Sequence, residues 1–309
     1  MSSSSLIVSV PDARLRDALG PLPAGVEIIE WDMNGPAPTS SIDIVVPPYM
    51  RPRSILQLLD GVTTRLVQSQ VLGYDGVKEE LPKGHVYANA VTVHEASTAE
   101  LALALILASQ RGIADFVRAA EKGEWRPRPY PSLADRSVLL VGYGGVGKAI
   151  EARLLPFETS VTRVASSERV DERGTIYALS ALPELLPEAD IVVIGVPLTP
   201  STTHLVNDAF LSLMRDQSLL VNIARGLVAD TDALLAHAQS GRLRLALDVT
   251  DPEPLPEGHP LFSLPNVLIS PHVGGATSAM LPRMARLLRE QIERMQRGDE
   301  PLNVVVRSI

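Results

Sequence analysis

Short apolar runs rich in valine, isoleucine and leucine alternate with helix-like stretches along most of the chain. This alternation is typical of parallel sheets whose strands are joined by crossover helices. In the first hundred residues, the runs that predict strands are residues 6–10, 26–30, 42–46, 66–69 and 86–87. Further along, the predicted strands are residues 137–141, 161–164, 191–196, 219–223, 245–249 and 267–269. The later group fits a doubly wound parallel sheet, so the pattern predicts an α/β fold.

Helical patterns indicate how these strands are grouped. Residues 97–125 include Thr98 and Glu100 near their start, contain no proline and have a long apolar face, which predicts one long helix. Shorter helices are predicted at residues 148–155 and 231–240, and a last one at residues 282–297 would return the chain to the first group. We therefore expect a discontinuous smaller domain of residues 1–97 and 280–309, a second domain of residues 98–279, and a ligand in the cleft between them.

Composition and charge remove several classes of function. A hydrophobic fraction of 45% is typical of an ordered protein with a large apolar interior. A formal net charge of −8 disfavours binding to nucleic acid or to an anionic membrane, since both need a concentrated basic surface. The absence of cysteine excludes disulfides and thiol nucleophiles. The histidines are dispersed, without the paired spacing of metal ligands, so we expect no metal.

The chain shows no sign of export or membrane insertion. Its first residues, MSSSSLIVSV, carry no basic residue before the short apolar run, unlike a secretory signal. The longest apolar stretch, residues 101–108, is much shorter than a membrane span. We expect a cytoplasmic enzyme.

A glycine-rich turn follows the strand predicted at residues 137–141. The sequence GYGGVG places Gly142, Gly144 and Gly147 in a GxGxxG spacing, with Gly145 and Val146 between them, at the start of a helix. In this context the glycines allow a tight turn, close approach to a pyrophosphate and close helix packing. A strand-to-helix turn without a ligand is the simpler alternative, and dinucleotide binding is favoured over it.

The end of the next strand bears on the choice of dinucleotide. An acidic residue is expected there when the ligand is NAD. The position holds Ala165 instead, and it is followed by Ser166, Ser167, Glu168 and Arg169. Two hydroxyls and an arginine favour the 2′-phosphate of NADP, whereas Glu168 and the possibility of an ordinary solvated loop leave NAD open.

Three later segments place polar residues after predicted strands: Arg225 in NIARG, Glu253 in DVTDPEPLP and His272 in SPHVGG. In a doubly wound sheet the carboxyl ends of the strands border the ligand site, so these three side chains can converge despite their separation in sequence. Each alone has an ordinary explanation as a surface arginine, a loop acid or a structural histidine. Together they are the candidate catalytic residues.

The order and spacing of several motifs resemble one family along nearly the whole chain. GYGGVG, PLTPSTTHLVN, NIARG, DVTDPEPLPEGHPL and SPHVGGAT are similar, in that order, to the D-isomer-specific 2-hydroxyacid dehydrogenases. The DVTDPEPLP stretch is most similar to the glyoxylate/hydroxypyruvate reductases of that family. The resemblance implies a Rossmann domain and a smaller flavodoxin-like domain that binds substrate. It also implies hydride transfer between NADP, or NAD, and a small 2-oxo acid that becomes the D-2-hydroxy acid.

The resemblance also implies a role for each candidate residue. Arg225 would bind the substrate carboxylate and polarise the 2-oxo group. His272 would exchange a proton with the carbonyl oxygen, and Glu253 would orient its imidazole. Further cofactor contacts are implied at Val196, Pro197, Thr202, Ile223, Asp248 and Gly274.

For the smaller domain, the resemblance implies that backbone amides near Leu72 and Gly73 hold the substrate carboxylate. The chain departs from the commoner, smaller residues of this loop by having Val71 and Leu72. Side-chain contacts with the substrate are implied at Tyr49 and Met50, and the nearby Arg51 and Arg53 are either further contacts or exposed arginines.

Other readings stay open at this point. A phosphoglycerate dehydrogenase-type enzyme would need basic residues for a phosphate that we cannot place. A formate dehydrogenase of this family would carry glutamine in place of Glu253. A nucleotide-sensing protein similar to the corepressors of this fold is the alternative from outside enzymology, since fold alone does not establish function. The long apolar helix near Leu101 and the resemblance together predict a homodimer.

Overall fold

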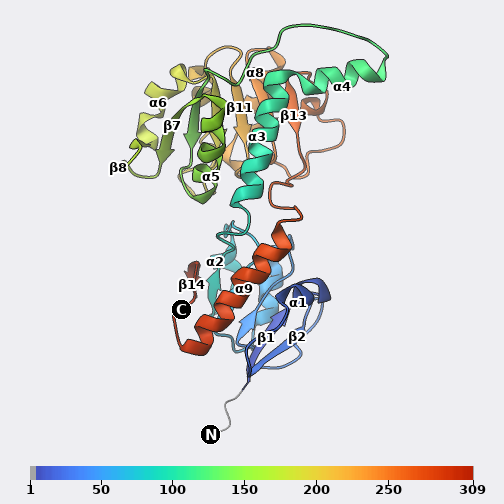
Figure 1. The fold of residues 1–309 in the computed structure, drawn as a ribbon, viewed down its shortest axis with the longest axis vertical. Coiled ribbons are helices and arrows are strands. Elements are labelled where there is room, and N and C mark those ends of the chain that lie inside the picture. Colours follow the sequence, from blue (N-terminus) through green and yellow to red (C-terminus); the bar gives the residue numbers. More distant parts are fainter. Residues whose placement is uncertain (1–4, 309) are drawn as a thin grey trace. The chain divides into compact units, whose positions relative to one another are not determined.

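The computed structural model describes residues 5–308, and these fold into two compact units (Figure 1). The first unit comprises Met1–His94 and Thr277–Ile309, and the second comprises Glu95–Ala276. The first unit is therefore discontinuous in sequence. The boundaries expected from the sequence, after residues 97 and 279, lie close to these divisions.

The first unit is built on a six-stranded sheet. In chain order its elements are β1 Leu6–Val10, α1 Ala13–Leu19, β2 Val26–Glu30, β3 Ile44–Val45, the 3₁₀ helix Arg53–Leu59, β4 Leu66–Gln68, α2 Val77–Glu80, β5 Val86–Ala88, α9 Met280–Arg297 and β14 Val304–Arg307. The strand order is β14-β5-β4-β3-β1-β2, and all neighbours pair in parallel except β14, which runs antiparallel to β5. The sequence analysis did not identify β14, whose four residues are only partly buried at the sheet edge.

Alternate residues of these strands enter two separate hydrophobic clusters. Val8 and Ile44 pack beneath α1 and α9, whereas Ile7 and Val45 face the 3₁₀ helix and α2. Successive strand side chains point to opposite faces of a sheet, so covering both faces explains why these strands read as continuous apolar runs.

The second unit contains an eight-stranded sheet. Its elements are α3 Glu95–Arg111, α4 Ile113–Glu121, β6 Ser137–Val141, α5 Gly145–Leu154, β7 Ser160–Ala165, β8 Arg169–Asp171, β9 Gly174–Ala178, α6 Leu182–Leu185, β10 Ile191–Ile194, α7 Asp208–Leu213, β11 Leu219–Asn222, α8 Thr231–Gln239, β12 Arg244–Leu247 and β13 Val267–Ile269. The strand order is β13-β12-β11-β10-β6-β7-β9-β8. The chain starts in the middle at β6, proceeds to one edge and returns to β10, so the strand order reverses between β6 and β10.

All six strands predicted for this unit are present, but the sheet is larger than expected. The β8–β9 hairpin extends it beyond β7, with β9 parallel to β7 and β8 antiparallel to β9. The two hairpin strands have three and five residues, and only Ile176 among them is buried. Strands this short and polar do not show the apolar run by which the others were recognised.

The single long helix predicted for residues 97–125 is wrong. The structure has two helices, α3 and α4, separated by Gly112 in the left-handed conformation with φ +63°. A Cβ at Gly112 would lie 2.0 Å from Cε1 of Tyr130, so both the backbone angle and the packing require glycine there. Among residues 5–308, no helix is both long and apolar enough to cross a membrane.

Candidate active site

The glycine-rich turn joins β6 to α5 at the point where the strand order reverses. Gly142 has φ +115°, and a Cβ there would lie 2.4 Å from the carbonyl carbon of Gly195, which follows β10. A Cβ on Gly147 would lie 2.3 Å from the carbonyl oxygen of Gly142. Both glycines are therefore required for the turn itself, because the backbones approach too closely for any side chain.

Gly144 differs from these two glycines, because a Cβ there would meet nothing within 4 Å. It is the N-cap of α5 and offers no side-chain cap to the amides of Gly145, Val146 and Gly147, although the Glu95 side chain lies close by, with its Oε1 3.2 Å from where a Cβ on Gly145 would stand. A helix N-terminus carries partial positive charge and backbone donors for a phosphate. The turn thus fits a dinucleotide: a glycine faces open space where a pyrophosphate would approach.

The end of β7 leads into the residues expected to choose between the two dinucleotides. Ser166 and Ser167 are exposed immediately after the strand, and Arg169 is the first residue of β8. The Arg169 guanidinium donates to the carbonyl oxygens of Ser167 and Tyr143, each at 3.3 Å. Arg169 therefore lies against the glycine-rich turn, in which Tyr143 stands between two of the motif glycines.

A charged network that the sequence analysis missed connects this turn to the hairpin. The Tyr143 hydroxyl donates to the buried Glu151 carboxylate on α5, which also accepts from Arg173 Nη1 at 2.8 Å. Burial, followed by the hydrogen bond to Glu151, raises the pKa of Tyr143 above its usual value. The buried Arg163 of β7 donates to Asp171 at 3.0 Å, and the Arg173 amide, followed by Arg163 itself, lowers the pKa of that carboxyl.

The structure brings Glu253 and His272 together, although 19 positions separate them. His272 Nδ1 lies 2.6 Å from Glu253 Oε1. Because a carboxylate only accepts hydrogen bonds, Nδ1 carries a proton and Nε2 is the ring atom left to exchange one. Both side chains are partly accessible, with exposures of 27% for His272 and 41% for Glu253.

Asp248, at the end of β12, organises the loop that carries His272. Its buried carboxylate accepts from the Ser270 hydroxyl at 2.7 Å and from the amides of Val273 and Gly274 at 2.9 and 3.0 Å. Its carbonyl accepts from the His272 amide at 2.8 Å. His272 has φ +53°, a backbone conformation uncommon for a residue with a side chain, and these bonds hold it there. Asp248 thus uses its oxygens to build the loop, a role that its proposed cofactor contact did not suggest.

Arg225 follows β11 and lies in a loop that touches the one carrying Glu253. A Cβ on the next residue, Gly226, would lie 1.8 Å from the carbonyl oxygen of Thr250, so the two loops meet backbone to backbone. The Arg225 side chain donates to Ala224 O at 2.7 Å. The Asn222 side chain donates to the Arg225 carbonyl at 3.1 Å, which further fixes the loop.

The remaining cofactor candidates of this unit are distributed around the same strand ends. Val196 and Ile223, after β10 and β11, are buried, and Pro197 is exposed. The Thr202 hydroxyl donates to Pro197 O at 2.7 Å and accepts from the Thr199 amide at 2.8 Å. Thr202 therefore closes its own loop. A Cβ on Gly274 would lie 3.0 Å from Asp248 Oδ2, which leaves little room for any larger residue.

In the first unit, side chains hold the loop that contains Leu72 and Gly73. Asn89 Nδ2 donates to Leu72 O at 2.9 Å, and Arg53 Nη2 donates to Gly73 O at 2.8 Å. The carbonyl and the following amide of a trans peptide point in opposite directions, so Asn89 turns the Gly73 amide away from itself. Within the described residues the amides of Leu72 and Gly73 donate to no protein acceptor. The sequence offered no signal for Asn89, because its partner lies 17 positions away.

Tyr49 and Met50 stand on a neighbouring loop of the first unit. The Tyr49 ring stacks on that of buried His94, with centroids 5.9 Å apart, and His94 Nε2 lies 2.6 Å from Gln70 O. Met50 is 51% exposed and has φ +56°. Arg51 Nη2 donates to the Asn34 side chain at 2.5 Å on the surface.

Metal ligands do not gather in any of these places. Across residues 5–308, no group of three or more histidine, aspartate or glutamate side chains is arranged to hold a metal ion.

The chain is similar to known proteins over the glycine-rich turn and the loops around it. A model of the D-isomer specific 2-hydroxyacid dehydrogenase, NAD binding domain, matches residues 103–274. The chain belongs to the D-isomer specific 2-hydroxyacid dehydrogenase family. As a 2-hydroxyacid dehydrogenase it is an NAD(P)-dependent oxidoreductase, and the α/β fold, the family and the cofactor class expected from the sequence are confirmed.

Individual relatives agree with this assignment. The 2-hydroxyacid dehydrogenase is 34% identical over 258 residues to a glyoxylate reductase of Pyrococcus horikoshii, covering 79% of this chain and 77% of that protein. It is 30% identical over 294 residues to the glyoxylate reductase/hydroxypyruvate reductase of Homo sapiens, covering 89% and 90%.

Solved structures are similar over almost the whole chain. An NADPH-dependent glyoxylate/hydroxypyruvate reductase of Sinorhizobium meliloti, in complex with NADP and sulfate, has a TM-score of 0.83, 25% identity and 98% coverage of each chain. A D-isomer specific 2-hydroxyacid dehydrogenase of Xanthobacter autotrophicus, in complex with NADPH and MES, has a TM-score of 0.82, 26% identity and 99% coverage of each.

Proposed function

We propose that this dehydrogenase reduces glyoxylate, hydroxypyruvate or a closely related 2-oxo acid to the 2-hydroxy acid, in the D configuration where C2 becomes a stereocentre, with NADPH as the preferred reductant. The observation that carries the proposal is the 2.6 Å bond between His272 Nδ1 and Glu253 Oε1, which lie beyond the carboxyl ends of β13 and β12 in the sheet that also carries the glycine-rich turn. The named activities of the relatives support this choice of substrate.

The chain's own residues would divide the work as follows. When bound, the nicotinamide supplies the hydride. Arg225 holds the substrate carboxylate, for which a planar, permanently charged guanidinium is suited. His272 donates the Nε2 proton to the carbonyl oxygen as that oxygen gains charge, and takes it back in the reverse direction. Glu253 keeps the proton on Nδ1 and stabilises the charged imidazole, so it is a positioning residue.

Cofactor binding is assigned to the turn and its neighbours in the second unit. The amides from Gly144 to Gly147 would bind the pyrophosphate, and Ser166, Ser167 and Arg169 would bind the 2′-phosphate of NADP. Val196, Pro197, Ile223 and Gly274 would line the site, with Thr202 and Asp248 shaping the loops that carry them. Direct titration with NADP and NAD would test the preference.

Substrate contacts in the first unit are assigned to Leu72, Gly73, Tyr49 and Met50. The two amides would receive a carboxylate oxygen, because neither donates a hydrogen bond to a protein group among residues 5–308. Tyr49 and Met50 would contact the group that C2 of the substrate carries besides its carboxylate, and their partial exposure leaves them accessible to it.

The test of the activity is a set of initial rates of NADPH and NADH oxidation. Glyoxylate, hydroxypyruvate, pyruvate, phenylpyruvate and 3-phosphohydroxypyruvate would be compared at matched concentrations. We expect the highest kcat/KM with glyoxylate or hydroxypyruvate. Preference for 3-phosphohydroxypyruvate would instead assign a phosphoglycerate dehydrogenase-type activity, and nucleotide binding without turnover of any acid would contradict the proposal.

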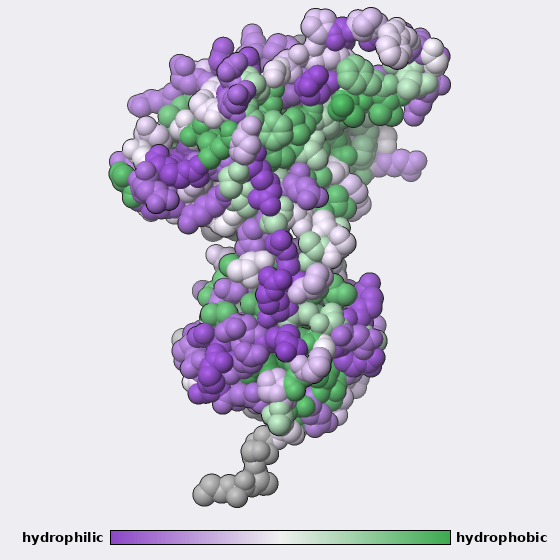
Figure 2. Space-filling model, viewed as in Figure 1, coloured by the Kyte–Doolittle hydropathy of each residue, from purple (hydrophilic) through white to green (hydrophobic). Residues whose placement is uncertain are grey.

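We further propose a homodimer formed through α4 and the segment that follows it. None of the nine residues of α4 is buried, and Ile113, Phe116 and Val117 are 43–55% exposed. Hydrophobic side chains gather along this helix (Figure 2). A helix this short is not stable by itself in water, so an uncovered apolar side favours a partner. The sequence analysis based the dimer on the apolar helix near Leu101, which is α3. Because α3 is largely covered within its own unit, the proposed contact moves to α4.

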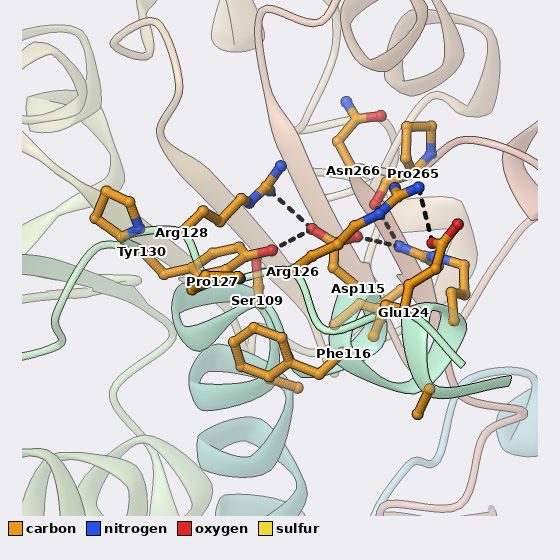
Figure 3. A pocket seen from close by; sticks show the side chains of 18 of the residues that line it. Ser109, Asp115, Phe116, Glu124, Arg126, Pro127, Arg128, Tyr130, Pro265 and Asn266 are labelled. Atoms are coloured by element: carbon orange, nitrogen blue, oxygen red, sulfur yellow. Dashed lines mark hydrogen bonds and ion pairs between the residues drawn. The ribbon is translucent and has the colours of Figure 1, made fainter. Parts of the chain in front are cut away.

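The segment after α4 folds back over a hollow of about 1140 Å³. Asp115 on α4 accepts from the Tyr130 hydroxyl at 2.7 Å and from Arg128 at 2.8 Å, which ties the returning chain to the helix (Figure 3). Trp125, which lies in this segment and lines the hollow, is 95% exposed. An exposed tryptophan beside an apolar hollow is suited to a two-fold contact, in which the tryptophan of each copy enters the hollow of the other. The mass of the protein in solution would test the dimer, and cell fractionation would test the cytoplasmic location that the sequence predicts.

A further inference from the structure

The β8–β9 hairpin presents three alternate residues to the glycine-rich turn and its helix. Arg169 and Asp171 are two apart on β8 and therefore point to the same face. Arg173, in the turn before β9, extends the series by two more positions. The three contact three different supports: the Tyr143 carbonyl, Arg163 on β7 and Glu151 on α5.

Two of these contacts anchor the hairpin. Asp171 accepts from Arg163, whose side chain is only 3% exposed, and Arg173 donates at 2.8 Å to Glu151, whose side chain is only 4% exposed. Glu151 also accepts from the Tyr143 hydroxyl, and the Arg163 guanidinium lies 5.2 Å from the centre of the Tyr143 ring. A carboxylate and an arginine this deeply buried need such partners, because burial of an unpaired charge is costly. These contacts therefore fix the hairpin against Tyr143, the residue between Gly142 and Gly144.

The third contact is different in kind. Arg163 and Arg173 are balanced by Asp171 and Glu151, so the anchors carry no net charge. Within residues 5–308, Arg169 pairs with two carbonyl oxygens and makes no ion pair with a carboxylate. Its charge is thus not neutralised by a protein anion, and its guanidinium is exposed beside the turn.

We propose that the β8–β9 hairpin is the device that selects the phosphorylated dinucleotide, with Glu151, Asp171 and Arg173 as positioning residues for Arg169. The anchors hold Arg169 against Tyr143, where its fork can receive the two charged oxygens of a 2′-phosphate without first moving. The inference rests on the proposed preference for NADPH and names the residues that produce it.

The experiment measures binding of two fragments to the full-length protein: adenosine 2′,5′-bisphosphate, which carries the 2′-phosphate, and 5′-AMP, which lacks it. The variants are Arg173→Gln and Asp171→Asn, with Arg169→Ala to remove the contact itself. The matched control is Arg153→Gln, because Arg153 lies on α5 but donates to Ala149 O of its own helix. Circular dichroism spectra would confirm that each variant is folded.

We expect Arg173→Gln and Asp171→Asn each to weaken the bisphosphate by about three- to tenfold, the worth of one ordinary hydrogen bond, and to leave AMP within about twofold. Arg169→Ala should lose more of the discrimination, and Arg153→Gln should lose none. Equal weakening of both fragments would mean that the network only supports the fold, and would overturn the inference. Equal binding of both fragments by the wild-type protein would also overturn the inference. If that protein still turned over glyoxylate or hydroxypyruvate, the proposed reaction would remain supported.

Discussion

A single hydrogen bond determines what His272 can do as an acid or a base. Glu253 accepts the hydrogen bond from the Nδ1 proton, so only Nε2 is available for exchange with a substrate. The histidine stands on a left-handed backbone held by Asp248, and the carboxylate stands on a loop that meets the Arg225 loop at Gly226. The chemistry at this site therefore depends on residues that never touch a substrate.

The first prediction separates the proton donor from its positioning residue. His272→Asn should lower kcat by about 100- to 10,000-fold, the usual worth of a general acid, while NADPH affinity stays close to wild type. Glu253→Gln keeps an acceptor for Nδ1 but loses the charge, so its loss should be smaller. Steady-state rates and nucleotide titrations would show this, and full turnover in His272→Asn would exclude the assignment.

Asp248 is expected to matter for the His272 loop as well as for stability. Asp248→Asn leaves one acceptor oxygen for three donors, so we expect the free energy of unfolding to fall by about 1–3 kcal/mol, the usual cost of leaving a buried donor without a partner. Thermal denaturation would measure the loss, and kcat should fall because the loop no longer fixes His272. An unchanged melting temperature with unchanged kcat would mean that the carboxylate is dispensable.

At the scale of elements, the three motif glycines of the β6–turn–α5 unit do not all have the same reason to be glycine. Gly142 and Gly147 are required by the fold, whereas Gly144 faces open space. Gly144→Ala should therefore fold normally, since φ is −96°, but should weaken NADPH binding because the new methyl group lies where a phosphate would approach.

The matched control for this prediction is Gly35→Ala, which also meets nothing within 4 Å and is not required by a positive φ. Fluorescence titration with NADPH would compare the two variants. Equal affinity in Gly144→Ala and wild type would show that the pyrophosphate lies elsewhere.

Elements were predictable where one local pattern dominated. The central strands of the second unit, β6, β10, β11 and β12, were predictable because both of their faces are buried, which gives a continuous apolar run whatever the rest of the chain does. The β8–β9 hairpin lacks such a run, since it lies at a sheet edge and is partly exposed. β14 has only the short run Val304–Val306, which is partly exposed at the edge of the other sheet and was not recognised as a strand. The break at Gly112 was missed because a glycine within a helical pattern is usually tolerated, and only the Tyr130 ring makes it decisive here.

For the whole molecule, the prediction concerns association. Phe116→Asp places a charge on the exposed side of α4 and should weaken a homodimer by about 30-fold or more, if Phe116 is an anchor of the interface. The control is Phe157→Asp, because Phe157 has a comparable exposure, 40% against 43%, on a different surface. Sedimentation or light scattering at micromolar concentration should detect monomers only for Phe116→Asp, and a wild-type monomer would remove the basis of the proposal.

The sequence by itself determined the fold class, the position of the dinucleotide turn and the family, because each depends on local patterns or on the order and spacing of motifs along the chain. Only the tertiary structure decided which side chains pair: Glu253 with His272, Asp248 with the loop of residues 270–274, and Arg173 with Glu151. These contacts join segments between 19 and 26 positions apart. Their formation depends on how strand ends and loops are placed in space, and no pattern along the chain records that placement.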